Sequence, residues 1–197
     1  MPKLVTRRIT PAGFLLALLL FLFLPGLAAS CDAQPGNGNP ASLEYTGTDL
    51  ATGGHRVVGD LGVSPANIAK VEAGFRLSGP VQVLAIVTAA LLLLGLATAL
   101  LRTPRARALA AVVVAGAAAA MLAVTESQAL AKLTEVTRKI ATTFTEITEQ
   151  PQDPEKLTAE AVHVQYGFWL TAGVVLVVFV LNVFVALRRR QVTSDEE

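Results

Sequence analysis

The chain has 197 residues, of which 53% are hydrophobic and only 16% are charged, and its formal net charge at pH 7 is +1. Soluble domains need more charge to cover their surfaces, so this composition excludes an ordinary soluble protein and predicts a membrane protein.

The N-terminal segment, residues 1–30, has a basic start, an apolar stretch and an end of small residues. This pattern is typical of a first transmembrane helix and also of a secretory signal peptide. The apolar stretch Phe14–Leu27 is short for a span and is broken by Pro25 and Gly26, which favours a signal sequence. The segment is longer than most signal peptides, which favours a retained helix. Both interpretations predict that the following residues are exported.

Cys31 is the only cysteine, so an intramolecular disulfide cannot form. The run Ala29-Ser30-Cys31 resembles the end of a bacterial lipobox, whose cysteine receives diacylglycerol before the leader is removed. Ala28 stands where Leu is usual in that motif. Cys31 is therefore a candidate lipidation site, with an unmodified thiol as the alternative.

The first outer segment begins with a loop over Asp32–Pro40 that is rich in Pro, Gly and Asn. Leu43–Thr46 and Arg56–Val58 are candidate strands of a short β-hairpin, separated by a turn-prone stretch that contains Gly47, Gly53 and Gly54. A short helix is predicted to begin at Ser64 and to continue to Phe75, because Pro65 suits a first helical turn.

Three further stretches, Val81–Leu101, Ala108–Val124 and Phe168–Leu187, contain no charged residue or histidine. At about 1.5 Å per residue, a span of 20 residues matches a hydrocarbon core of about 30 Å. Neither Gly nor Pro occurs between Ala117 and Gln150, so the third span is predicted to continue outward as one helix from Ala108 to Glu149.

The outer part of this helix is predicted to be an amphipathic stalk. Apolar residues recur there at intervals of three or four, which places them on one face of the helix. They are Leu130, Leu133, Val136, Ile140, Phe144 and Ile147. Pro151 and Pro154 should end the stalk, and Glu155–Gln165 is predicted to form a short returning helix.

Basic residues gather in three short segments beside the spans. They are Lys3, Arg7 and Arg8; Arg102, Arg105 and Arg107; and Arg188, Arg189 and Arg190. Because basic residues near a span stay on the cytoplasmic side, four spans with both termini in the cytoplasm satisfy all three clusters.

The predicted fold is an all-α membrane protein, a four-helix transmembrane bundle with a small extracytoplasmic cap that includes the short hairpin. Its regions in order are 1–30 (first span or signal sequence), 31–80 (first outer loop), 81–101 (second span), 102–107 (cytoplasmic turn), 108–149 (third span and stalk), 150–167 (outer return), 168–187 (fourth span) and 188–197 (cytoplasmic tail). The expected location is the bacterial inner membrane.

Few residues suggest chemistry. His55 and His163 have no neighbouring ligands at metal-binding spacing, and no charged residue lies inside a span, so we expect no enzyme activity, metal or cofactor. Asn182 and Gly116 are interpreted as helix-packing residues, because an amide bonds across helices and a glycine permits close approach. Tyr166, Phe168 and Trp169 are typical of an interface anchor, and together with Phe144 they are candidate partner contacts.

Three stretches are similar to a group of small bacterial four-span membrane proteins without a known activity. They are Phe23–Cys31 with its Ser-Cys end, Tyr45–Gly53 with Leu-Ala-Thr-Gly, and Tyr166–Leu170 with Gly-Phe-Trp-Leu. The insert between Asp32 and Ala41 departs from that group. The resemblance implies the topology and brings no function.

We therefore expect a non-enzymatic protein whose outer cap binds another membrane protein, as an accessory subunit of a larger complex. The alternative is a homo-oligomeric transporter or channel component. Membrane lipid is an expected partner, and nucleic acid is not.

Overall fold

The computed structural model describes residues 8–31, 41–59, 75–77, 79–148 and 161–194, with the backbone alone at 31, 41, 140–148 and 188–194. Its elements in chain order are α2 (Thr10–Phe23), β1 (Pro25–Cys31), β2 (Ala41–Thr46), α3 (Gly47–Thr52), β3 (Arg56–Val58), α5 (Pro80–Ala97), the 3₁₀ turn η2 (Thr98–Leu100), α6 (Pro104–Thr148), β4 (Val162–Val164) and α8 (Tyr166–Ser194).

Three helical segments are long and apolar enough to cross a membrane: Pro80–Leu100, Pro104–Lys139 and Tyr166–Leu187. The fourth apolar helix, α2, has only 14 residues. Its length of about 21 Å is less than the hydrocarbon thickness of about 30 Å. The protein is thus mostly helical, with three long apolar helices and a small sheet.

The four apolar helices pack side by side, with α2 and α6 each in contact with both α5 and α8. On α6 the inward face carries the buried small residues Ala111, Ala115 and Ala118, while Val113 on the outward face is 70% exposed. Large apolar side chains are also exposed on α5 and α8. Small residues inside and large apolar residues outside are what helices packed within lipid require.

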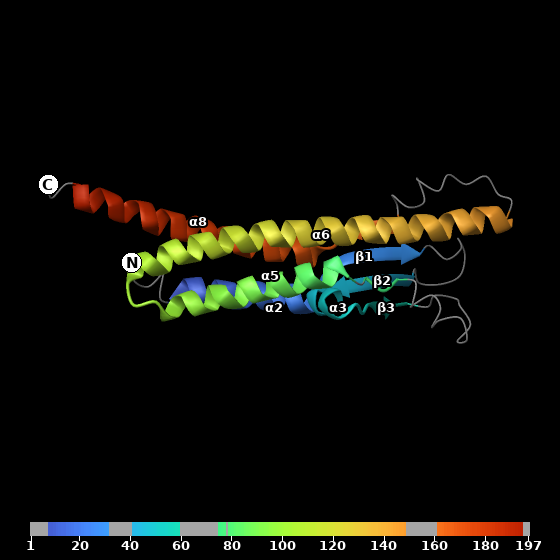
Figure 1. The fold of residues 1–197 in the computed structure, drawn as a ribbon, viewed down its shortest axis with the longest axis horizontal. Helices are drawn as coiled ribbons and strands as arrows, with labels where there is room; N and C mark the ends of the chain where they lie inside the picture. The colour runs from blue at the N-terminus through green and yellow to red at the C-terminus, as the bar shows by residue number, and fades with distance from the viewer. Residues whose placement is uncertain (1–7, 32–40, 60–74, 78, 149–160, 195–197) are drawn as a thin grey trace.

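A four-stranded antiparallel sheet with the order β3-β2-β1-β4 lies beyond one end of α2 and α5 and alongside the outer part of α6 (Figure 1). The predicted hairpin is present, because β2 pairs with β3 in the register Leu43 to Val57. The inner strand β1 follows directly after α2, so the small-residue end of the N-terminal segment lies within the sheet. Leu27 and Ala29 of β1 are opposite Tyr45 and Leu43 of β2, and all four are buried.

Two local predictions differ from the structure in part. Of the returning helix predicted over Glu155–Gln165, residues 155–160 lie outside the described part, Ala161 is helical, and residues 162–164 form strand β4, which pairs with β1. The predicted turn after β2 is helix α3. Its N-terminus is fixed by a capping box, in which Thr46 accepts a bond from the Asp49 amide and Asp49 accepts one from the Thr46 amide.

The predicted continuous third helix is present as α6, which runs from the α5–α6 turn along the bundle and past the sheet (Figure 1). Of the predicted outer stripe, Leu133 is buried, and Leu130 and Val136 pack against the same core. The side chains of Ile140, Phe144 and Ile147 lie outside the described part, as do the loop Asp32–Pro40 and most of the helix predicted from Ser64.

Candidate functional site

The junction between the helices and the sheet is closely packed and contains polar groups. A Cβ atom at Gly167 of α8 would collide with the backbone carbonyl of Pro25, and one at Gly47 would collide with that of Phe21. The Gln165 amide donates a 2.7 Å hydrogen bond to the Gly26 carbonyl. Glycine at these two positions therefore lets the start of α8 and the start of α3 lie directly against the α2–β1 connection.

Glu126 of α6 lies inside this junction and is only 7% exposed. No hydrogen-bond donor among the described residues reaches its Oε1 atom. The carboxyl group faces the backbone at Gly26, and it lines a small cavity together with Phe21, Tyr45 and Thr171. The cavity offers about 10 Å³ to the centre of a water-sized sphere, which is about what one water molecule needs.

An unpaired carboxylate is costly to bury, so the chemistry open to Glu126 is limited. The carboxyl group can exchange a hydrogen bond with one water molecule held in this cavity. No group of three or more His, Cys, Asp or Glu side chains that could hold a metal ion occurs in the described ranges. The junction is therefore a polar joint between the helices and the sheet.

Tyr45 fixes the sheet side of the junction. Its ring is fully buried, and its hydroxyl donates a 2.8 Å hydrogen bond to the Phe75 carbonyl. Burial, with a smaller contribution from the nearby Asp49 carboxylate, raises the pKa of Tyr45 well above its usual range. His55 packs on this ring, with centroids 6.1 Å apart, and His163 is exposed beside Gln165. The two histidines are therefore not brought together.

The predicted aromatic cluster separates into one inner and two outer residues. Phe168 packs against the core and makes an edge-to-face contact with Trp169, with ring centroids 5.2 Å apart. Trp169 is 65% exposed and Tyr166 is 58% exposed. Both outer rings are thus available for an interface with lipid or with a partner, whereas the position of the Phe144 side chain lies outside the described part.

The two predicted packing residues are both at helix contacts. Asn182 of α8 is buried and bonds the Thr10 hydroxyl of α2 and the Val178 carbonyl. A Cβ atom at Gly116 of α6 would lie 3.5 Å from Phe179 of α8, an ordinary contact distance. Thr88 and Thr125 add a 3.1 Å hydrogen bond between α5 and α6. Cys31 ends strand β1, opposite Ala41.

A groove of about 440 Å³ runs along the outer part of α6. Two neighbouring rows of α6 residues line it, each with a spacing of four residues. One row is Ser127, Ala131 and Glu135, and the other is Leu130, Thr134 and Arg138. At roughly 100° per residue, this face is turned about 140° from the α6 face buried under the sheet. The groove is therefore a separate surface of α6.

Sequence reasoning missed two features. Glu126 follows Leu122 by four residues and precedes Ala129 and Leu133 by three and seven, so helical spacing placed it on the buried face of α6. The spacing Thr46-x-x-Asp49 was a helix-start signal within the stretch predicted as a turn.

Comparison with known proteins adds no relative. No protein-family model matches the sequence, and neither a curated protein nor a solved structure matches it.

Proposed function

We propose that this is a non-enzymatic bacterial inner-membrane protein whose outer cap binds a helix of another membrane protein, as an accessory subunit of a membrane complex. In this proposal α2, α5, α6 and α8 all cross the membrane, and both termini are cytoplasmic. The cap consists of the sheet, α3 and the part of α6 beyond Val124.

The membrane arrangement is supported by where the basic segments fall. The start of α2, the α5–α6 turn and the end of α8 lie at the end of the molecule opposite the sheet (Figure 1). Arg8 precedes α2, Arg102 lies in the α5–α6 turn, Arg105 and Arg107 lie in the first turn of α6, and Arg188 to Arg190 lie in the last turns of α8. A common cytoplasmic side for these segments follows the positive-inside rule and places the sheet outside. Arg8 and Ile9, which precede α2, are helical too and extend it by two residues.

The single observation that carries the partner proposal is the α6 groove. Ser127, Ala131 and Thr134 are small, so a ridge of side chains from a second helix can approach the α6 backbone closely. The sheet covers another face of α6 and holds the helix in place, because α6 contacts both β1 and β4. At one end of the groove Glu135 pairs with Lys139 of the same helix at 2.7 Å, whereas Arg138 offers a positive charge, so the partner helix should carry an acidic residue there.

Site-specific photocrosslinking in intact cells tests this proposal. A photoreactive residue at Thr134 should crosslink to one defined foreign membrane protein, whereas one at Lys132, which is exposed but does not line the groove, should not. Ala131→Trp should fill the groove and abolish the Thr134 product, and Lys132→Trp should leave it unchanged.

Two outcomes would contradict the proposal. A Thr134 product with twice the mass of the chain would favour the homo-oligomeric alternative. A product that survives Ala131→Trp, or no product at all, would show that the groove is not the binding surface.

A further inference from the structure

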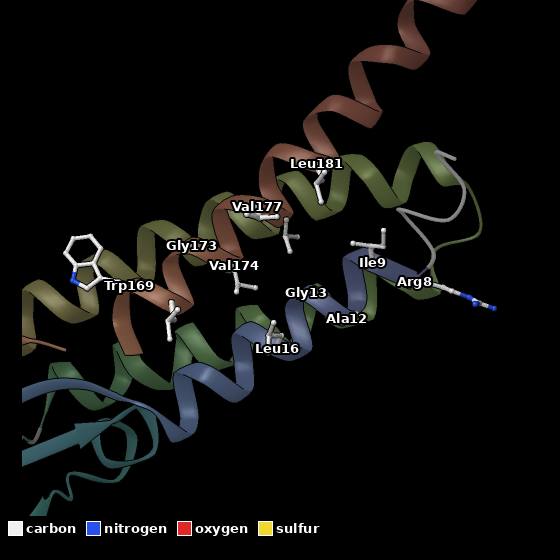
Figure 2. A pocket seen from close by; sticks show the side chains of 12 residues that line it. Arg8, Ile9, Ala12, Gly13, Leu16, Trp169, Gly173, Val174, Val177 and Leu181 are labelled. Carbon is white, nitrogen blue, oxygen red and sulfur yellow. The ribbon is translucent and has the colours of Figure 1, made fainter. Parts of the chain in front are cut away.

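A second groove lies between α2 and α8, on the lipid-facing side of the helices (Figure 2). Its volume is about 680 Å³, and its wall is almost entirely apolar. Ile9, Leu16 and Leu170 on its rims are each between 43% and 48% exposed. This open apolar groove cannot hold ordered water, because no polar side chain inside it offers hydrogen bonds.

Two glycines explain the shape of this groove. Gly13 lets α2 approach Val178 of α8 so closely that any Cβ atom there would collide with it, and this contact closes the floor. At Gly173 no atom lies within 4 Å of the position a Cβ atom would take, so the space above the floor stays open. The groove is therefore bounded by a tight helix contact below and is accessible from the side.

The two ends of the groove differ in chemistry. Arg8 lies at one end, with its guanidinium directed away from the apolar wall beyond the start of α2, and Trp169 lies at the other (Figure 2). Between Trp169 and Leu181 the groove follows α8 for about 18 Å at 1.5 Å per residue. One leaflet of the hydrocarbon core is about 15 Å thick, half of about 30 Å, so the groove has the length of one acyl chain.

We propose that this groove binds one anionic phospholipid from the leaflet at the Arg8 end, with an acyl chain along the apolar wall and the phosphate paired with the Arg8 guanidinium. The inference rests on the membrane arrangement proposed above, which makes this the cytoplasmic leaflet. Arginine suits a phosphate because its planar donors can bind two oxygens at once. A transmembrane helix is the competing occupant, and the experiment below distinguishes the two.

Native mass spectrometry of the purified full chain with phosphatidylglycerol and phosphatidylcholine tests the proposal. The wild type should retain one phosphatidylglycerol in preference to phosphatidylcholine. Gly173→Leu should weaken phosphatidylglycerol binding at least tenfold by filling the groove without a collision. Arg8→Gln should reduce the preference for the anionic lipid about fivefold, since one basic residue near an anionic lipid surface has an effect of this order.

Matched controls are available on surfaces outside the groove. Ala120→Leu enlarges an exposed residue of α6, and Arg102→Gln removes an exposed charge from the α5–α6 turn. Both variants should bind phosphatidylglycerol as the wild type does. Equal binding of the two lipids by the wild type, or unchanged phosphatidylglycerol binding by Gly173→Leu, would overturn the proposal. A wild-type dimer that Gly173→Leu dissociates would overturn it in favour of a helix contact.

The Thr134 crosslink separates this proposal from the proposed function. In the Gly173→Leu variant the crosslink should persist while lipid binding is lost, because the two grooves are on different helices. If the wild-type background binds the lipid but gives no Thr134 crosslink, the partner proposal alone is contradicted.

Discussion

Asn182 of α8 donates a 3.0 Å hydrogen bond to the hydroxyl of Thr10, 172 positions earlier in the chain at the first residue of α2. Both side chains are buried, at 1% and 3% exposed. This contact joins the first residue of α2 to the middle of α8, two helices that no short loop connects. Asn182→Leu should therefore loosen α2 from α8 and lower the unfolding free energy by about 1 kcal/mol.

A double-mutant cycle with Thr10→Val measures this contact, using thermal unfolding in detergent micelles. The two single variants should each be destabilised, and the double variant should be no less stable than the worse single variant. Leu176→Ala, at a 60% exposed position of α8, is the control and should change little. Strict additivity of the two substitutions would show that the bond does not couple the helices.

Glu126 should tolerate the loss of its charge but not the loss of its volume. Glu126→Gln keeps the shape and removes a group that is costly to bury as an unpaired anion, so the melting temperature should stay the same or rise. Glu126→Ala should enlarge the cavity and cost about 2 kcal/mol or more. A large fall in the melting temperature of Glu126→Gln would mean that the carboxylate has a partner that the described residues do not supply.

Stability should fall at high pH because of Tyr45. Since burial raises the folded-state pKa of Tyr45 above its ordinary value of 10.0, the folded state holds a proton that the unfolded state loses. The resulting stability is fully present below pH 10 and is lost as the pH rises further. Tyr45→Phe should reduce this alkaline loss, measured by thermal unfolding between pH 8 and 11, while Tyr166→Phe, at an exposed position, should keep it. Identical pH profiles for wild type and Tyr45→Phe would refute the assignment.

The mature chain should retain α2 and β1. Cleavage before Cys31, as a lipobox would direct, would remove all of α2 and six residues of a strand that pairs with both β2 and β4. Intact mass spectrometry of protein from native membranes should therefore give a mass that includes residues 10–30. A chain that begins at a diacylated Cys31 would contradict this prediction.

The long helices could be predicted from the sequence, whereas only the β2–β3 hairpin of the sheet could be. This difference has a physical reason. Charge-free stretches predict α5 and α8, and the absence of Gly and Pro predicts the length of α6, because these are local properties of the sequence. The pairing of β1 with β2 and β4 brings together Ala29, Leu43 and Val162, which are far apart in the chain. Residues 25–31 are small and apolar, so their local pattern fits the end of a span as well as a buried strand.

The site was less predictable than the fold. Helical spacing places Glu126 on the inner face of α6, but its burial depends on Gly26 and Phe21 lying opposite, which no local pattern indicates. The two grooves likewise depend on which helix faces lie against neighbours. Gly13 and Gly173 are both glycines in apolar helices, and only the packing shows that one closes a contact while the other opens a space.

In the proposed arrangement, α6 crosses the membrane and carries its outer groove to the side opposite the α5–α6 turn. Labelling with a membrane-impermeant maleimide tests it most directly, with Thr103→Cys and Thr134→Cys each placed in a Cys31→Ser background. Both positions are exposed, so accessibility depends on the side of the membrane alone. Thr134→Cys should be labelled in intact spheroplasts and Thr103→Cys only after permeabilisation. Labelling of Thr103→Cys from outside, or of both positions from one side, would contradict the account.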